Sequence, residues 1–473
     1  MEQKEDSQYK SMTQDPISRL IPRLALPTVL SMMTSGIYNT ADTYFVSQLG
    51  TSASGAVGVV FSLMAIIQAV GFTLGMGSGS IISRRLGERD QRAANVCGSS
   101  AFAAALVFGA ALSVVCLCNL KGLVKILGAT PTILPYASDY AMWILLGAPI
   151  ICSSFVMNNI LRSEGHAAFS AIALTSGGAL NIALDPLFIY VFNLGTAGAA
   201  MATVASQAVS FLIFLQFFLR KKGTVALSIK YVSAKIKTYR EIISVGAPAL
   251  FRQGLASVAT ILLNVNAGVY GDAAISAMTI VTKVIMLCAS VMIGIGQGFM
   301  PVAGYNYGAR NYKRVRKAYA FTATSAFFIL LALAAALFAF APKIIACFRD
   351  DDKVIQVGTF ALRAQAAGLP LHALIISVSM LMQACGKKLA ATFLSLNRQG
   401  IYFIPLIVLL PRAIGLTGVE VAQASADILS AITAVPYLLW FFGKLRQAEN
   451  VSTPLANRTD FSYSAIRQFD VND

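Results

Sequence analysis

The chain alternates between long apolar runs and short polar stretches from about residue 16 to residue 446. Each run approaches or exceeds the roughly 20 residues that an α-helix needs to cross a bilayer. The runs lack the alternation at period two that marks an outer-membrane barrel. We count about twelve runs and therefore expect an all-α polytopic membrane protein with twelve transmembrane helices.

The composition supports a membrane protein, with 56% hydrophobic and only 12% charged residues. A soluble domain of average composition carries about 25% charged residues. The net charge is +16, but the bases cluster in every second loop between apolar runs. That pattern sets membrane topology, so we expect both termini in the cytoplasm and no nucleic-acid partner. The seven cysteines show no paired spacing, so neither a disulfide framework nor a cysteine metal site is expected.

An internal repeat relates the two halves of the chain. The Gly75–Gly79 cluster matches Gly294–Gly298, and Gly195-x-x-Gly198 matches Gly415-x-x-Gly418, at an offset of roughly 220 residues. Duplication of six spans keeps both halves in the same orientation and predicts two six-helix bundles related by a parallel repeat. The glycine clusters lie at the ends of spans without a preceding strand, so they indicate close helix packing rather than a nucleotide loop.

The repeat and the basic stretches divide the chain into five parts. No apolar signal segment is expected at the start of the chain, and the last part is polar enough to be disordered. The expected parts are a polar cytoplasmic N-terminus (1–15), a first bundle (16–219), a basic cytoplasmic linker (220–240), a second bundle (241–446) and a disordered cytoplasmic tail (447–473).

One acidic side chain stands out within an apolar run. Asp185 lies in the run 167–191, where an acid at the bilayer centre costs roughly 2.5–3.5 kcal/mol and usually has a function. Asn181 shares its helix face at four residues' distance, and Pro186 weakens the helix beside it. Asp42 is the other acid embedded in the first half. Two nearby carboxylates in a low dielectric cannot both stay ionised, so the pair is expected to hold a proton, or alternatively Na⁺. A purely structural role, in which Asp185 pins the bundle through Asn181, remains open.

Five motifs, in order along the chain, resemble the multidrug and toxic compound extrusion (MATE) family, and within it the MepA/DinF-like bacterial branch. The resemblance covers roughly Pro16 to Arg446. The motifs are Ile37–Gly50 around Asp42, Asn181-Ile-x-x-Asp185-Pro186, Gly195-x-x-Gly198-Ala-Ala-x-Ala-Thr203, Gln297-Gly-x-x-Pro301-x-x-Gly304-Tyr-Asn306 and Gln399-Gly-x-x-x-x-Pro405.

The resemblance implies a cation-coupling site in the first bundle and a first-span kink at Pro27. The matching site positions are Asp42, Asn158, Asn181, Asp185 and Thr203, with Tyr38 one turn before Asp42. Acids that other branches of the family carry on the seventh and tenth spans are missing here, so the site is expected only in the first bundle.

The implied function is secondary antiport by alternating access, and the chain is not expected to be an enzyme. Organic compounds of cationic or amphipathic character would leave in exchange for H⁺, which we favour, or Na⁺. Such a protein would reside in a bacterial inner membrane, confer antibiotic resistance, act as a monomer and need no cofactor. The candidate substrate cavity includes Met32, Phe155, Gln253 and Asp427.

The sequence allows more than one role for several polar residues within the spans. Asp427 could bind a cationic substrate or make a polar packing contact, and a pair between Lys283 and Asp427 is one possibility. The two histidines, His166 and His372, are interpreted as packing or loop residues. The roles of the embedded bases are left open at this stage for Arg252, Lys283, Arg363 and Arg398.

Three other functions compete with export. A lipid-linked oligosaccharide flippase of the same superfamily would require Arg252, Lys283 and Arg363 to cluster between the bundles and face a phosphate. An intramembrane aspartyl protease is disfavoured because Gly271-Asp272 lies in a turn outside the spans. A receptor without transport activity is disfavoured by the duplicated architecture.

Overall fold

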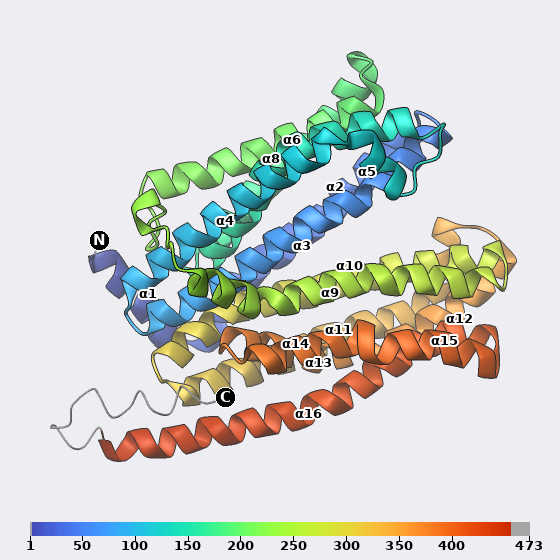
Figure 1. The fold of residues 1–473 in the computed structure, drawn as a ribbon. Coiled ribbons are helices and arrows are strands. Elements are labelled where there is room, and N and C mark those ends of the chain that lie inside the picture. The colour runs from blue at the N-terminus through green and yellow to red at the C-terminus, as the bar shows by residue number, and fades with distance from the viewer. Residues whose placement is uncertain (1, 456–473) are drawn as a thin grey trace.

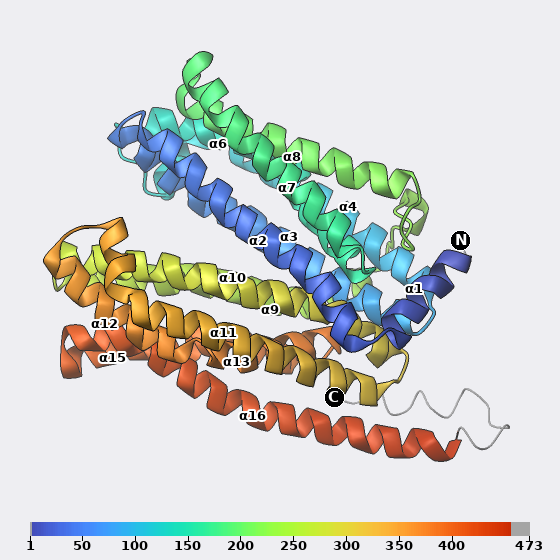
Figure 2. The ribbon, with the colours of Figure 1, turned by 180° about the vertical axis from the view of Figure 1, so that it is seen from behind.

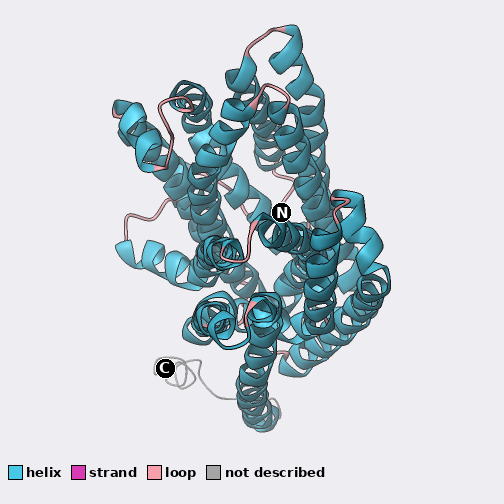
Figure 3. Cartoon of the chain, turned by 90° about the vertical axis from the view of Figure 1, so that its right-hand side faces the viewer, coloured by secondary structure: helices cyan, strands magenta, loops and turns pink. Residues whose placement is uncertain are grey.

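The computed structural model describes residues 2–455, which form helices joined by short loops (Figure 1). Within that range the chain contains no strand (Figure 3). Eleven of the described helices are long and apolar enough to cross a membrane. A twelfth span comes from the pair α12 (Asp352–Gly368) and α13 (Leu371–Ala384), which is bent by 51°. The expectation of a twelve-span, all-helical protein is therefore confirmed.

The first six spans form one bundle, drawn from blue to green in Figure 1. The short α5 (Leu120–Ile126) joins its third and fourth spans, and the π-helix η1 (Leu187–Val191) extends its fifth. The spans are α2 (Ile17–Ser47), α3 (Thr51–Gly87), α4 (Gln91–Cys118), α6 (Leu134–Ser163), α7 (Ala167–Pro186) and α8 (Gly195–Leu219).

The second bundle repeats this arrangement below the first in Figure 1. Its fifth span consists of three pieces, the middle one again a π-helix, just as η1 follows α7 in the first bundle. Besides α12 and α13, its helices are α9 (Ile236–Gly268), α10 (Asp272–Gly308), α11 (Tyr312–Phe348), α14 (Lys388–Leu396), η3 (Asn397–Tyr402), α15 (Phe403–Ile414) and α16 (Leu416–Leu455).

Two helix boundaries differ from the sequence expectation. The helix α9 begins at Ile236, inside the stretch expected to be linker up to residue 240, and α16 continues to Leu455, beyond the expected end at 446. The first extension contains Lys237 and Arg240, and the second begins with Gln447, Ala448 and Glu449; these residue types favour helix even where they leave the apolar core. The rest of the expected tail, 456–473, lies outside the described residues.

The N-terminal helix α1 (Glu2–Gln14) lies across one end of the molecule, which we call the base. It contacts both bundles. Asn306 of α10 donates a 3.0 Å hydrogen bond to the carbonyl of Met12, and Arg89, which follows α3, pairs with Asp6 at 3.2 Å. We call the opposite end the mouth. In Figures 1 and 2 the two bundles lie close at the base and spread apart toward the mouth.

Glycines permit the close approach of the bundles at the base. A Cβ atom on Gly77 of α3 would collide with the carbonyl oxygen of Ile242 in α9, and one on Gly246 would collide with that of Thr73. Glycines of α10 meet α2 and α3 in the same way. This confirms that the repeated glycine clusters serve close helix packing. We call these residues the glycine seam: Gly77, Gly246, Gly294, Gly298, Gly304 and Gly308.

The linker between the bundles is anchored at the base by side chains of the first bundle. The carboxylate of Glu164, which follows α6, accepts hydrogen bonds from the backbone N–H groups of Thr224 (2.9 Å) and Val225 (3.1 Å). Asn95 of α4 accepts another from Ala226 at 2.9 Å. These side chains satisfy backbone groups that no helix or sheet can pair.

Candidate cation and substrate sites

The two acids of the first bundle lie on neighbouring helices near the mouth. Asp42 is on α2 and Asp185 on α7, and these helices pack together (Figure 2). Each acid is within about two turns of the mouth end of its span. Asp185 is fully buried, and Asn181 donates a 3.1 Å hydrogen bond to its Oδ1 atom. The shared helix face expected from the spacing of four residues is therefore present.

Two further helices complete a polar network around the acids. The amide of Asn181 lies 3.5 Å from the hydroxyl of Thr203 on α8. The hydroxyl of Tyr140 on α6 donates to Asp42 at 3.4 Å. We call these five residues the acidic network: Asp42, Tyr140, Asn181, Asp185 and Thr203.

Three oxygens of the acidic network are buried without a hydrogen-bond partner among the described residues. They are Oδ1 of Asp42, Oδ2 of Asp185 and Oδ1 of Asn181. Buried polar atoms are nearly always paired, so each exception calls for an explanation. Carboxylate, amide and hydroxyl oxygens are suitable ligands for Na⁺ as a hard cation, and a carboxylate oxygen can instead take up a proton.

The structure does not bring every expected residue to this network. Asn158 of α6 accepts a hydrogen bond from Ser170, which lies fifteen residues before Asp185 on α7, or roughly 22 Å along the helix. Tyr38 is closer, because its ring packs over the position of Gly178 one turn before Asn181.

The sequence analysis singled out Pro27 in this region but did not identify Tyr140 as a member of the network. Pro27 lies inside α2, which is continuous from Ile17 to Ser47. Sequence reasoning missed Tyr140. The available signal was a tyrosine within an apolar span, because a buried phenol hydroxyl usually needs a polar partner.

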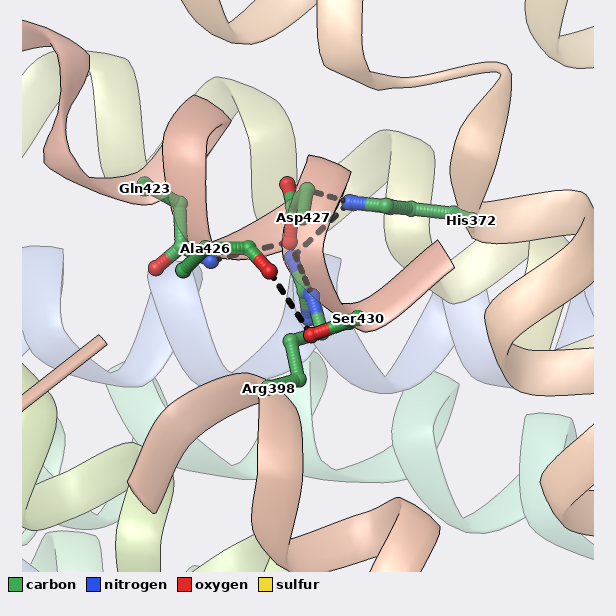
Figure 4. Close-up of polar contacts among 6 residues, drawn as sticks. All are labelled: His372, Arg398, Gln423, Ala426, Asp427 and Ser430. Atoms are coloured by element: carbon green, nitrogen blue, oxygen red, sulfur yellow. Dashed lines mark hydrogen bonds and ion pairs between the residues drawn. The ribbon is translucent and has the colours of Figure 1, made fainter. Parts of the chain in front are cut away.

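Asp427 of α16 belongs to a separate polar cluster in the second bundle (Figure 4). Arg398 of η3 donates to its Oδ1 atom at 2.7 Å, and Nε2 of His372 lies 2.9 Å from its Oδ2 atom. Gln423, one turn earlier on α16, donates at 3.1 Å. Asp427 is 2% exposed, so this is a buried ion pair rather than an open cation site.

The cluster excludes one possibility that the sequence left open and corrects one interpretation. Asp427 pairs with Arg398 and not with Lys283, whose side chain is exposed on α10. His372 is a member of the polar cluster and not a passive packing residue, whereas His166 does pack against the ring of Phe217 at 5.1 Å.

The bases that a flippase would need do not gather at one place. Arg363 of α12 donates to the carbonyl of Phe338 and lies 5.2 Å from the centroid of that ring. Lys283 does not line the cavity of the second bundle, whereas Arg252 does. The arrangement required for phosphate recognition by all three bases is absent from the described part of the chain.

The second bundle encloses a cavity of about 260 Å³. Gln253 of α9 lines it, as expected, together with Arg252, Arg398 and Gln423. The other three expected cavity residues are not among its lining: Asp427 is held in the ion pair with Arg398, and the remaining two belong to the first bundle. Met32 is half-buried on α2, and Phe155 packs inside the first bundle with its ring centroid 4.6 Å from that of Phe72.

Two repeated six-helix bundles, each with a buried polar site within its spans, define a polytopic transporter fold. The MatE family model matches residues 27–187 and 248–409, one stretch in each bundle. The chain belongs to the MatE family, and the two matches agree with the internal repeat.

Relatives and solved structures that match the chain over more than nine-tenths of its length support this assignment. The chain is 27% identical over 431 residues to the multidrug export protein MepA of Staphylococcus haemolyticus (strain JCSC1435), covering 91% of this chain and 95% of that protein. It is also 27% identical over 437 residues to MepA of Staphylococcus aureus (strain NCTC 8325 / PS 47), covering 92% and 96%.

Among solved structures, one is described as an outward-facing conformation of a multidrug resistance MATE family transporter of the MOP superfamily. It has a TM-score of 0.87 and 29% identity, covering 93% of this chain and 98% of that chain. A MATE crystal structure in the straight conformation has a TM-score of 0.88 and 28% identity, with 93% and 99% covered. These relatives and neighbours are transporters and not enzymes.

Proposed function

We propose that the chain is a multidrug export transporter of a bacterial plasma membrane that exchanges organic compounds for H⁺ or Na⁺. The relatives named as multidrug export proteins support export, and the acidic network supports coupling to a cation. The proposal needs one copy of the chain and no cofactor.

The observation that carries the coupling is the pair Asp42 and Asp185 with unpaired buried oxygens. A carboxylate that merely holds helices together would have a partner for each of its two oxygens, as Asp427 does. An oxygen without a partner is instead available for a proton or a metal ion that comes and goes.

In the proposed cycle the base faces the cytoplasm, in accord with its basic loops. A cation enters from the mouth and loads at the acidic network, only about two turns from that end. Loading neutralises the acids and favours the rearrangement that closes the mouth and opens the base. The membrane potential supplies roughly 2.3 kcal/mol per charge per 100 mV to this inward step.

The test uses the full chain in proteoliposomes with a fluorescent organic substrate, supplied in a cationic and an anionic form. Export is measured under a pH gradient alone and under a Na⁺ gradient alone. Asp42→Asn and Asp185→Asn are expected to abolish gradient-driven export. Asp139→Asn is the matched control, because Asp139 is exposed on α6 beside Tyr140 and outside the network.

Normal export by both network variants would refute the coupling site. If neither gradient drives export by the wild-type chain, antiport itself is refuted. Export under only one of the two gradients would identify the coupling ion.

A further inference from the structure

The cavity of the second bundle has an unbalanced positive charge. Its charged lining residues are Arg252 and Arg398, and no Asp or Glu lies among the described residues that line it. The remaining polar lining consists of amides and hydroxyls, which include Gln253, Gln365, Gln399 and Ser379.

The charge of Arg398 is already compensated. Asp427 lies 2.7 Å from its Nε atom. This contact holds the guanidinium against α16 (Figure 4). The ion pair therefore neutralises the charge of Arg398, which forms part of the cavity wall.

Arg252 has no such compensation. Within the described residues it forms no ion pair, and the hydrogen bond recorded for it runs to the sulfur of Met76 at 3.5 Å. A thioether is a weak acceptor that bears no charge. An unpaired base inside a membrane span is costly and is usually functional, so Arg252 calls for an anionic partner.

Arg252 also lies at the boundary between the two bundles. Met76 belongs to α3 of the first bundle, whereas Arg252 belongs to α9 of the second. The glycine seam still joins these helices at Gly246, but nothing lies within 4 Å of a Cβ placed on Gly254. The guanidinium thus lies at the edge of the cavity, on the side of α9 that borders the first bundle.

A second uncompensated base lies beside the same methionine. Arg162 of α6 lines a small pocket together with Met76, and donates to Gln297 of α10. Its Nε and Nη2 atoms are buried without a partner among the described residues. No Asp or Glu lies among the described residues of that pocket either, so the positive charge continues from one bundle to the other.

We propose that the cavity binds an amphipathic organic anion and that Arg252 receives its acidic group, a carboxylate, sulfonate or phosphate. Guanidinium groups bind such planar or tetrahedral oxyanions through two parallel hydrogen bonds. Apolar side chains of the lining, among them Leu263, Ile285 and Phe403, would hold the hydrophobic part. As a statement about transported substrates, the inference rests on the proposed export function.

This inference replaces the expectation of a cationic substrate in the cavity. The acid considered for binding such a substrate was Asp427, and Asp427 is paired with Arg398. The two bundles then carry opposite charges: acids for the coupling cation in the first bundle, and a base for the substrate in the second.

The test measures equilibrium binding to the full chain in vesicles without any ion gradient. The probes are radiolabelled naphthalenesulfonate and naphthyltrimethylammonium, which share one apolar ring system and differ in charge. Arg252→Gln is expected to weaken sulfonate binding by roughly tenfold or more, the usual effect of losing a hydrogen bond to a charged group. Arg252→Lys should retain part of the affinity, because it keeps the charge but loses the paired geometry.

Arg363→Gln is the matched control, since Arg363 contacts Phe338 and does not line the cavity. Thermal unfolding of each variant verifies that it is folded. Competition by inorganic phosphate would indicate a site for free anions, whereas competition only by phosphatidylglycerol in the vesicles would indicate a lipid headgroup; both outcomes support an anion site.

Equal or tighter binding of the ammonium probe by the wild-type chain would overturn the inference, as would unchanged sulfonate binding in Arg252→Gln. Because no gradient is present, a failure of the coupling proposal leaves this result unaffected. The Asp42→Asn and Asp185→Asn variants should still bind the sulfonate.

Discussion

Buried acids in this protein differ in how completely their oxygens are paired. Asp427 has an arginine, a histidine and a glutamine as partners. Asp42 and Asp185 each have one paired and one unpaired buried oxygen. Removing one member of a buried ion pair leaves the other charge exposed to a low dielectric. Removing an acid that was never fully paired has no such penalty.

The first prediction at this scale compares two isosteric substitutions. Asp427→Asn should destabilise the protein by about 3 kcal/mol, because it leaves the partly buried Arg398 without its counter-charge. Asp185→Asn should leave the stability nearly unchanged while abolishing coupling. Thermal unfolding of the detergent-solubilised variants measures the difference. A similar loss of stability in both would contradict the division into a structural and a functional acid.

Spacing along the sequence grouped residues on one helix, whereas across helices only Asp42 and Asp185 were paired, as the embedded acids of the first half and through the family resemblance. Asn181 and Asp185 could be paired because four residues make about one helical turn. Arg398 and Asp427 come from different helices, and His372 from a third, so their meeting depends on how spans pack. The choice of Arg398 over Lys283 as partner of Asp427 depended on helix rotation, which composition does not reveal.

At the scale of elements, the two π-helices interrupt the fifth span of each bundle close to a candidate site. The π-helix η1 follows Pro186 directly, and η3 holds Arg398 and Gln399 at the corresponding place in the second bundle. Such bulges often occur at functional sites. Pro186 gave a local reason to expect the first interruption, whereas the stretch 397–402 contains no proline and its distortion was not predictable.

The linker supplies a prediction that depends on pH. Burial raises the pKa of Glu164 to about 8, although the backbone N–H groups of Thr224 and Val225 favour its ionised form. The other titratable side chain in this interaction is Tyr305 of α10. In the unfolded chain Glu164 should titrate near 4.3. Between these pH values the folded state keeps a proton that the unfolded state has lost, so stability should fall as pH rises through this window.

Glu164→Gln should remove this part of the pH dependence, since an amide cannot ionise. Melting temperatures measured at about pH 5 and about pH 9 would show a smaller difference for the variant than for the wild-type chain. Glu88→Gln is the control, because Glu88 is 42% exposed and pairs with Arg85 at the surface. An unchanged pH dependence in Glu164→Gln would show that Glu164 is already ionised in the folded protein.

For the whole molecule, the sequence predicted the internal repeat but not the contacts between the two bundles. The glycine clusters gave the offset of roughly 220 residues, and the two family matches confirm it. That Gly77, Gly294 and Gly298 of these clusters join one bundle to the other follows from the structure. The same residue type that identified the duplication thus forms the contact that alternating access would have to break and remake.

The last prediction concerns this contact. Gly77→Ala and Gly246→Ala each place a methyl group against a backbone carbonyl of the other bundle, which cannot rotate away. Overpacking of this kind costs about 1–3 kcal/mol, enough to shift an equilibrium between closed and open bases by roughly tenfold. We expect both variants to favour the open base and to export substrate more slowly.

The measurement uses the buried thiol of Cys385, which lies beside the seam at Gly386 against Arg84. With the less buried Cys116, Cys118 and Cys347 replaced by serine, its reaction with a polar thiol reagent reports opening of the base. The matched controls are Gly58→Ala and Gly254→Ala, on the same two helices, where an added Cβ meets no atom within 4 Å. The seam variants should react several-fold faster than the wild-type chain and the controls should not. Equal rates in all four would mean that the seam tolerates a methyl group and does not set the closed state.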